Sequence, residues 1–286
     1  MYEDDFDFDE RDLVDEEYPL RKDINTSIVG HNELGRMYHN CRNYGIENID
    51  LILPTFFEAN MSAVLLAMAH QLAKEDIHLG LSLENDHVLV RNGLVNSLLG
   101  EENPQITDRR QSTVPLRTFG QEEDDAFTAY IHDDFLGHRG NSHQLPYNLV
   151  KSLTRRYQEI FSNVALHAET TEPIYTCGQY FPGKKKFVFT LCDVGIGFLN
   201  NVSNFDNNIS TSLQAIEWAL QGNSTKTEAK GGLGLSTILS ECMNHMGELH
   251  IVSGDCYWKY CPEKGKTTYH LEHEFPGTTV HLVFRY

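Results

Sequence analysis

The pattern of hydrophobic and polar residues predicts alternating strands and helices in the N-terminal half of the chain. A mostly apolar run from Ile46 to Pro54 predicts a buried strand, and the apolar positions between Val64 and Leu72 then recur at helical spacing. From Ile77 to Leu83, leucines alternate with small or polar residues, which is the period of a strand. Residues 89–99 predict a second helix that is interrupted near Gly93. This order indicates a parallel or mixed sheet with helices packed on it.

Longer elements are predicted in the C-terminal half. An apolar stripe at helical spacing predicts a long helix from Pro146 to Ala168, and the apolar run that starts at Phe187 predicts a strand ending at Asp193. Before them, prolines and charges cluster from Glu101 to Asp125, a composition typical of a linker. We therefore expect an α+β protein in three parts: a disordered acidic tail at residues 1–20, a small α/β domain with the linker at 21–120, and a larger domain at 121–286.

Composition indicates where such a protein works. Hydrophobic residues make up 40% and aromatic residues 10% of the 286 positions, as in ordinary soluble globular proteins. The longest apolar run, Ala63 to Ala69, is too short to span a bilayer, and the start of the chain lacks the basic and apolar segments of a secretory signal. Four singly placed cysteines suit small buried hydrophobes in a reducing compartment: Cys41, Cys177, Cys192 and Cys242. We expect a cytoplasmic protein without membrane contact.

The charge balance argues against nucleic acids and anionic lipids as partners. With a formal net charge of -18, the chain repels phosphate backbones and anionic lipids, so direct nucleic-acid binding is not expected. Acidic residues crowd the first 20 positions, where aliphatic residues are scarce, and this predicts disorder. In the favoured interpretation this tail only increases solubility. In the alternative one it docks on a basic partner.

Three polar residues lie one helical turn apart on the predicted long helix. Glu159, Asn163 and His167 are spaced by four residues, so they share a face beside the stripe that contacts the core. Burying such groups is costly unless something satisfies them. A magnesium ion and a triphosphate would do so, because the Asn163 oxygen can ligate a hard cation while Glu159 holds a water or another attacking hydroxyl.

The predicted strand that ends at Asp193 is followed by Gly195 and Gly197. A carboxylate at a strand end can accept a hydrogen bond from an exocyclic amine, and glycines there let a flat ring approach the backbone. The Asp-x-Gly-x-Gly pattern has low specificity by itself, because many turns after strands look like it.

A glycine-rich turn from Lys230 to Ile238 leads directly into a predicted helix. Its free backbone amides at Gly231, Gly232 and Gly234 can form a phosphate cradle at the helix N-terminus. The spacing differs from that of a Walker A loop, which also requires a terminal Lys-Ser or Lys-Thr.

The three motifs described above, on the long helix, after the strand that ends at Asp193 and in the glycine-rich turn, are followed by Gly-Thr-Thr at residues 277–279. Their kind and order resemble those of the GHKL ATPases. That superfamily includes gyrase B, the MutL mismatch-repair protein, histidine kinases and the anti-sigma-factor serine kinases. The resemblance covers residues 149–286 and implies a Bergerat-type α/β sandwich with ATP and Mg²⁺ as cofactors. It implies that Glu159 is the general base, that Asn163 ligates the metal, and that Asp193 binds adenine with Gly195 and Gly197 beside the ring.

The same resemblance implies further contacts with the nucleotide. Besides the residues above, it assigns cofactor binding to His167, Lys226, Gly231, Gly232, Leu233, Gly234 and Thr278. It makes residues 199–230 a lid over the nucleotide. Within this lid, Thr211 to Gln221 predicts a helix with a capping box of Thr211 and Gln214, ended by Gly222.

Residues 32–100 resemble in pattern a STAS domain, the fold of anti-sigma-factor antagonists, in which a strand leads through a short turn into a helix. The corresponding turn is Glu58 to Met61. It lacks the serine that this family phosphorylates, so we expect a structural or docking role and no phosphorylation switch.

These features lead to one function hypothesis and two alternatives. The first is a switch that binds and hydrolyses ATP, with a nucleotide-ordered lid that controls a protein partner. The partner expected is a STAS-like protein, a protein encoded nearby or a second copy of this chain. The alternatives are a serine/threonine protein kinase of the anti-sigma-factor type, in which Glu159 activates a hydroxyl of the partner, and an ATP sensor that does not hydrolyse. A conventional histidine kinase is disfavoured because no phosphoacceptor histidine motif precedes Glu159.

Four more potential metal ligands lie near the C-terminus: Cys256, Cys261, His270 and His273. Their spacing is irregular for a zinc site. We instead expect a β-hairpin, with strands at residues 257–260 and 267–275.

Overall fold

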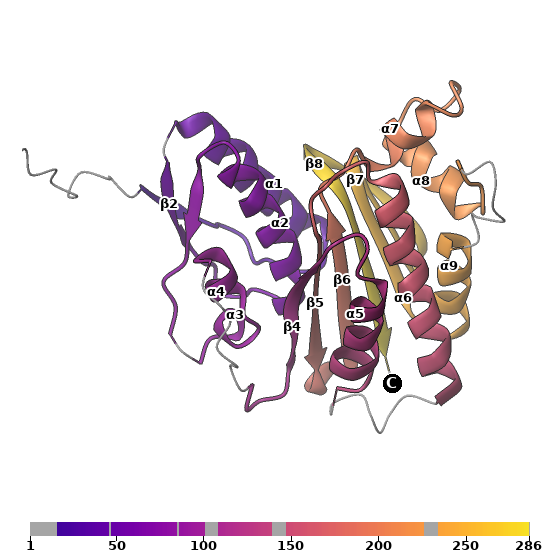
Figure 1. The fold of residues 1–286 in the computed structure, drawn as a ribbon, viewed down its shortest axis with the longest axis horizontal. Helices are drawn as coiled ribbons and strands as arrows, with labels where there is room; N and C mark the ends of the chain where they lie inside the picture. Colours follow the sequence, from indigo (N-terminus) through magenta and orange to yellow (C-terminus); the bar gives the residue numbers. More distant parts are fainter. Residues whose placement is uncertain are drawn as a thin grey trace, which may run out of the picture.

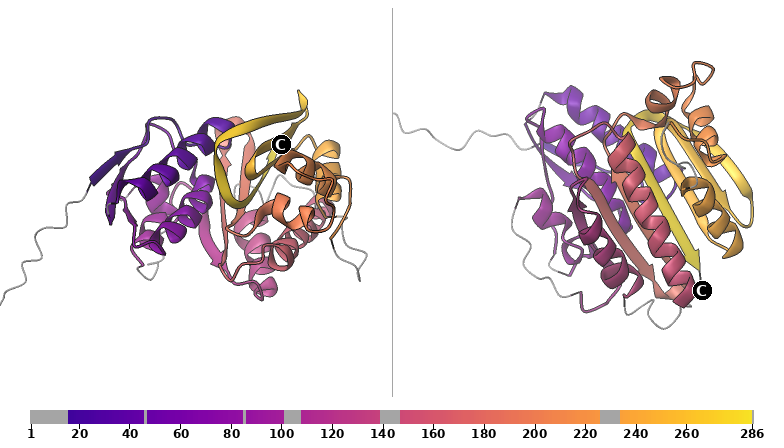
Figure 2. Two further views of the ribbon diagram at one scale, coloured as in Figure 1. Left: turned by 90° about the horizontal axis from the view of Figure 1, so that it is seen from above. Right: turned by 45° about the vertical axis from the view of Figure 1, so that its right-hand side comes forward.

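The structure is a computed structural model, which describes residues 16–45, 47–84, 86–100, 108–138, 147–225 and 234–285. These residues form four layers, shown from left to right in Figure 1: a small sheet, a layer of helices, a large sheet and a second layer of helices. Figure 2 shows the same arrangement from two further directions. The small sheet is parallel and the large one antiparallel, so the α+β class predicted from the sequence is confirmed.

The first two layers come from the N-terminal part of the chain. Three parallel strands follow the order β1-β2-β3. Helices α1 and α2 pack on one face of this sheet, and short helices lie beside it (Figure 1). The bounds are β1 (Glu16–Pro19), α1 (Ile28–Tyr44), β2 (Asn48–Ile52), the 3-10 turn η1 (Ala59–Met61), α2 (Ser62–Ala73), β3 (His78–Gly80), α3 (Val88–Arg91) and α4 (Leu94–Leu98).

The other two layers come from the C-terminal part. The large sheet has the order β4-β5-β6-β8-β7, and α5, α6 and α9 cover the face that points away from α1 and α2. The bounds are β4 (Thr113–Phe119), α5 (Asp124–Ala129), the π-helical η2 (Tyr130–Leu136), α6 (Tyr147–His167), β5 (Ile174–Phe181), the 3-10 turn η3 (Pro182–Lys184), β6 (Lys186–Asp193), α7 (Gly197–Ser203), α8 (Ser212–Leu220), α9 (Gly234–Asn244), β7 (Glu248–Cys261) and β8 (Gly265–Arg285).

Several local predictions are confirmed. Helices α2 and α6 and strand β6 lie where the apolar periods place them. Gly93, with a φ of 92°, separates α3 from α4. Thr211 caps α8 and forms the predicted capping box with Gln214, and Gly222 follows the helix with a φ of 85°. The six cysteines are buried and free. No helix in the described part of the chain is long and apolar enough to cross a membrane.

The predicted acidic tail is wrong over its last five residues, and residues 1–15 lie outside the described part. Residues 16–19 form strand β1, and the side chains of Tyr18 and Leu20 are buried in the core. The sequence does not indicate this strand, because its first two residues, Glu16 and Glu17, are acidic and exposed. Within residues 16–19 only Tyr18 is buried. The strand forms because its backbone groups hydrogen-bond to β2, and amino-acid composition cannot indicate a pairing with a distant segment.

Two further predictions need correction. Strand β2 is buried on one face only: Ile49 and Leu51 point into the core, whereas Asp50 and Ile52 are exposed. The predicted linker also contains a strand, because β4 pairs with β5 and forms one edge of the large sheet. Proline is tolerated at such an edge, where its missing N–H removes no ladder bond, and Pro115 lies there.

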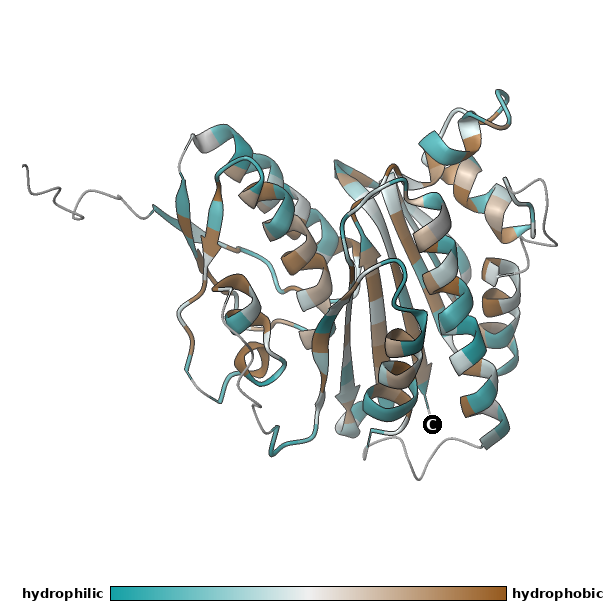
Figure 3. Cartoon of the chain, in the orientation of Figure 1, coloured by the Kyte–Doolittle hydropathy of each residue, from teal (hydrophilic) through white to brown (hydrophobic). Residues whose placement is uncertain are grey.

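The large sheet separates two hydrophobic cores. Helix α2 lies in the first core, between the two sheets, and nine of its 12 residues are buried. A helix that is apolar on all sides is stable only when it is covered on all sides. The second core joins the other face of the large sheet to α5, α6 and α9. In Figure 3 the strands behind α6 are mostly brown, while the outward face of α6 is mostly teal.

A seam of buried polar side chains joins α1 and the η1 turn to the large sheet. Asn60 Nδ2 donates to Thr190 Oγ1 at 2.9 Å, and Thr190 Oγ1 lies 2.7 Å from Nδ1 of His281. His281 Nε2 is 2.8 Å from His31 Nε2, so one of these two ring nitrogens carries the hydrogen. The turn from Glu58 to Met61, for which the sequence predicts a structural or docking role, is thus buried between the layers.

Candidate functional site

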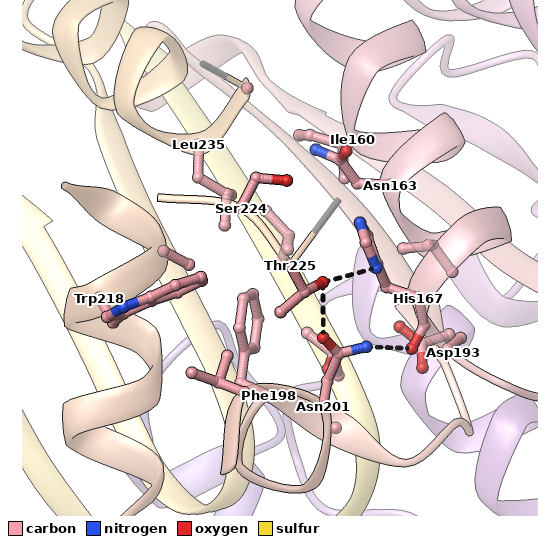
Figure 4. Close-up of a pocket in the computed structure, with 18 of the residues that line it drawn as sticks. Ile160, Asn163, His167, Asp193, Phe198, Asn201, Trp218, Ser224, Thr225 and Leu235 are labelled. Carbon is pink, nitrogen blue, oxygen red and sulfur yellow. Dashed lines mark hydrogen bonds between the residues drawn. The ribbon is translucent and has the colours of Figure 1, made fainter. Parts of the chain in front are cut away.

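A pocket of about 810 Å³, including the space at its open mouth, lies beside helix α6 (Figure 4). Its walls come from separate elements: Asn163 of α6, Asp193 at the end of β6, Trp218 of α8 and Gly234 at the start of α9. Residues of the three sequence motifs therefore meet at one pocket.

Asp193 is the buried acid of this pocket. Its side chain is 3% exposed, and Oδ1 accepts a hydrogen bond from the Gly195 N–H at 2.8 Å. Burial raises the pKa of the carboxyl to about 7, against the opposing effect of hydrogen bonds from the backbone N–H groups of Gly195 and Thr278. Thr278, which also lines the pocket, pairs with Asp193 across strands β6 and β8.

The glycines after Asp193 allow backbone segments to pack closely. A Cβ on Gly195 would lie 2.2 Å from the carbonyl oxygen of Ala168, at the end of α6. Gly197 has a φ of 72° and lines the pocket, whereas Gly195 is not among the lining residues. Gly277 has a φ of 134°, and a Cβ there would lie 2.2 Å from the Asp193 carbonyl oxygen. Gly277 and Thr278 lie inside β8.

Two of the three residues on the predicted helix face line the pocket. Asn163 and His167 do so, and Glu159 does not. Glu159 lies one turn earlier on α6, where Arg156 Nη1 donates to its Oε2 at 3.3 Å. Gly234 packs on this face: a Cβ there would lie 2.7 Å from Asn163 Nδ2 and 3.0 Å from Glu159 Cγ. The start of α9 is therefore in contact with both predicted functional residues.

A small hydrogen-bond network closes one side of the pocket, as Figure 4 shows. The hydroxyl of Thr225 lies 3.3 Å from His167 Nδ1 and donates to Asn201 Oδ1 at 3.1 Å. Asn201 Nδ2 in turn donates to the His167 carbonyl oxygen at 2.9 Å. The sequence predicts Asn201 and Thr225 only as members of the lid, residues 199–230. No spacing in the sequence distinguishes them, because their partner His167 is far away in the chain.

The opposite side of the pocket is apolar. Phe198 and Trp218 face it from α7 and α8, with Leu235 from α9 beside them (Figure 4). No motif in the sequence marks these side chains as pocket residues. Their apolar character alone does not separate a pocket wall from ordinary core.

The remaining predicted site residues differ in status. Lys226, Gly231, Gly232 and Leu233 lie outside the described residues. Within the described ranges, no group of three or more His, Cys, Asp or Glu side chains is placed to hold a metal. The cysteines and histidines near the C-terminus lie in the predicted hairpin, where strands β7 and β8 set Cys256 opposite His270.

Comparison with protein-family models finds no match for the chain, and comparison with curated proteins finds none either. The function of the pocket is therefore inferred from its own residues and geometry.

Proposed function

We propose that this pocket binds ATP with Mg²⁺ and that the protein is a nucleotide-dependent switch with a GHKL-type ATPase domain of the Bergerat fold. The observation that carries the proposal is the convergence of Asn163, Asp193 and Gly234 on one pocket, although the three lie in separate motifs along the chain. A chance likeness in three short motifs gives no reason for their residues to meet in space.

The adenine ring would occupy the end of the pocket near Asp193. Adenine presents an exocyclic amine as a donor, and the Asp193 carboxylate is a buried acceptor of suitable chemistry. Phe198 and Val280 supply apolar surface for the ring, and Thr278 adds a hydroxyl. This end of the pocket would give the base specificity.

The phosphates would lie toward Asn163 and the start of α9. The 11-residue helix α9 begins at Gly234, and a helix N-terminus favours anions. Mg²⁺ in nucleotide sites takes one or two protein oxygens and completes its octahedron with phosphate oxygens and water. Asn163 offers such an oxygen, so the donor set fits. The metal, when bound, would neutralise charge on the phosphates.

Bound nucleotide could change the protein surface by moving the residues that border the pocket. Thr225 closes the pocket through His167 and Asn201, and it immediately precedes the last part of the predicted lid. A triphosphate near Asn163 would compete with these weak contacts for the same space. Repositioning of residues 199–225 would then alter the surface available to a protein partner.

A non-hydrolysing sensor is the second candidate, and the position of Glu159 favours it. In the structure this carboxylate pairs with Arg156 and does not line the pocket. A general base must come within hydrogen-bond reach of the group it activates. Hydrolysis, or phosphate transfer to a partner hydroxyl, therefore requires Glu159 to leave Arg156.

Isothermal titration with ATP in excess Mg²⁺ tests the proposal. Wild type should bind, Asn163→Ala should lose at least about tenfold in affinity with Mg²⁺ but much less without it, and Ser162→Ala, the neighbour on α6, should match wild type. No binding by wild type at millimolar ATP, or equal affinity in all three proteins, would refute nucleotide binding at this site.

Labelled ATP then separates the alternatives. Release of free phosphate supports the hydrolysing switch, and transfer of label to a partner supports the kinase. Binding without either supports the sensor. Glu159→Ala should bind ATP like wild type and, for the first two functions, turn over roughly a hundredfold or more slowly.

A further inference from the structure

The small parallel sheet is covered on only one face by the described residues. Helices α1 and α2 pack on its inner face, and the core there includes Tyr18, Ile49 and Leu79. No described element lies on the outer face, which forms the left margin of the molecule in Figure 1. Parallel sheets are almost always covered on both faces, so this exposed face is an unusual surface.

Register identifies the side chains on the outer face. Glu17 pairs with Asp50, and Pro19 pairs with Ile52, so two rows cross β1 and β2. All four residues are exposed, and Ile52 is 45% exposed. The face therefore combines an acidic row with a neighbouring apolar row.

The third strand leaves room for the acidic row. Gly80 of β3 is the register partner of Asp50, and a Cβ on Gly80 would lie 2.2 Å from Asp50 Oδ1. The Asp50 carboxylate thus lies across the sheet toward β3. Its oxygens are presented along the face, where a cation from above can contact them.

The dimensions suit a single helix. Strands β1, β2 and β3 have four, five and three residues. At about 3.3 Å per residue and about 4.8 Å between strands, they make a face roughly 10 Å wide and, along β2, about 17 Å long. A helix is about 10 Å in diameter and covers 17 Å with about 11 residues. We propose that the outer face of β1, β2 and β3 is a docking surface for one basic amphipathic helix of a partner protein. Its apolar stripe contacts Pro19 and Ile52, and its Lys or Arg side chains contact Glu17 and Asp50.

Charge argues against two other occupants. A second copy of this chain carries -18 and would bring Glu17 and Asp50 near their own equivalents or other acids. Residues 1–15 are themselves strongly acidic and complement the face no better. Arg21 and Lys22 are exposed just beyond β1, so the basic side chains of the partner helix belong over the acidic row and not beyond it.

A model peptide tests this surface without a known partner. The probe is a fluorescein-labelled 18-residue helix of leucine and lysine with the leucines on one face, titrated by anisotropy. Glu17→Lys with Asp50→Lys should weaken binding about tenfold or more, and Ile52→Ser should weaken it several-fold. Glu122→Lys with Asp125→Lys makes the same change in net charge at exposed positions near α5 and should stay within twofold of wild type.

Methyl spectra then locate the peptide. In protein labelled at the isoleucine methyl groups, the Ile52 signal, assigned by its loss in Ile52→Ser, should shift on addition of peptide, whereas that of buried Ile251 should not. Circular dichroism confirms that each variant is folded. No binding by wild type at millimolar peptide, equal weakening by both charge reversals, or an unmoved Ile52 signal would overturn the proposal.

Discussion

The buried histidine seam should make the fold sensitive to acid, and His31 allows this to be measured. The ring is 3% exposed, and burial, assisted by the nearby His250, lowers its pKa from 6.5 to about 3. Burial also lowers the pKa of His281, with which His31 shares a hydrogen bond. A histidine that is neutral in the folded protein but protonated in the unfolded chain binds fewer protons when folded. Its contribution to stability is therefore lost as the pH falls from about 6.5 toward 3.

The loss of unfolding free energy follows from the number of pH units over which the unfolded chain binds a proton and the folded protein does not. Between pH 6.5 and pH 5, His31 stays neutral in the folded state, so each pH unit costs about 1.4 kcal/mol and the whole interval about 2 kcal/mol. Asp193 acts in the opposite direction, because its raised pKa makes the folded state bind more protons than the unfolded one over the same range. Wild type alone therefore gives a mixed result, and a variant is needed to isolate the histidine.

The assay compares the free energy of unfolding in urea at pH 7.5 and pH 5 for wild type and His31→Gln. The variant should be less stable at pH 7.5, because glutamine replaces a well-packed ring, yet it should lose about 2 kcal/mol less on acidification. His39→Gln, an exposed position on the same helix, is the matched control and should follow wild type. Equal acid losses in wild type and His31→Gln, within about 0.5 kcal/mol, would refute a buried neutral His31.

Three further predictions concern the pocket. Because the pKa of Asp193 is raised to about 7, ATP affinity measured by calorimetry should fall by up to about tenfold per pH unit below 7 in wild type relative to Asp193→Asn, in which this titration is absent. Gly234→Ala should weaken ATP binding about tenfold or more, because the new Cβ meets Asn163; Ala219→Gly, a lining change without new atoms, should weaken it less. Nucleotide should change the tryptophan fluorescence, and Trp218→Phe should abolish that change, because Trp218 lines the pocket while Trp258 is 3% exposed in the core.

Features that depend on local spacing could be predicted from the sequence. The face of α6 that carries Asn163 and His167 follows from four-residue steps, and the end of β6 at Asp193 follows from the end of an apolar run. The capping box of α8 is equally local. Such features are specified by neighbours within a few residues, so a single sequence contains the information.

Features that depend on distant partners could not be predicted. His31 and His281 are 250 positions apart, and neither has a local pattern that indicates a shared hydrogen bond. Strand β1 has acidic residues that suggest disorder, and it is ordered only because β2 lies beside it. Likewise, Thr225 and Trp218 border the pocket only after α8 folds back toward α6.

The large sheet carries the polar seam on one face and the pocket on the other, and this limits which parts of the protein could move if nucleotide binds in the pocket. Thr190 and Asp193 are both on β6, three residues apart, and so face opposite layers: Thr190 joins the polar seam and Asp193 the pocket. The seam is fully buried and close-packed, and moving β6 would break the hydrogen bonds of Thr190 in a place where water cannot replace them. Residues 199–225, by contrast, are tied to α6 by contacts such as those of Asn201 and Thr225. If the pocket binds nucleotide as proposed, the motion that costs least free energy is therefore one of α7 and α8 at the surface, with the large sheet and the small parallel sheet held in place.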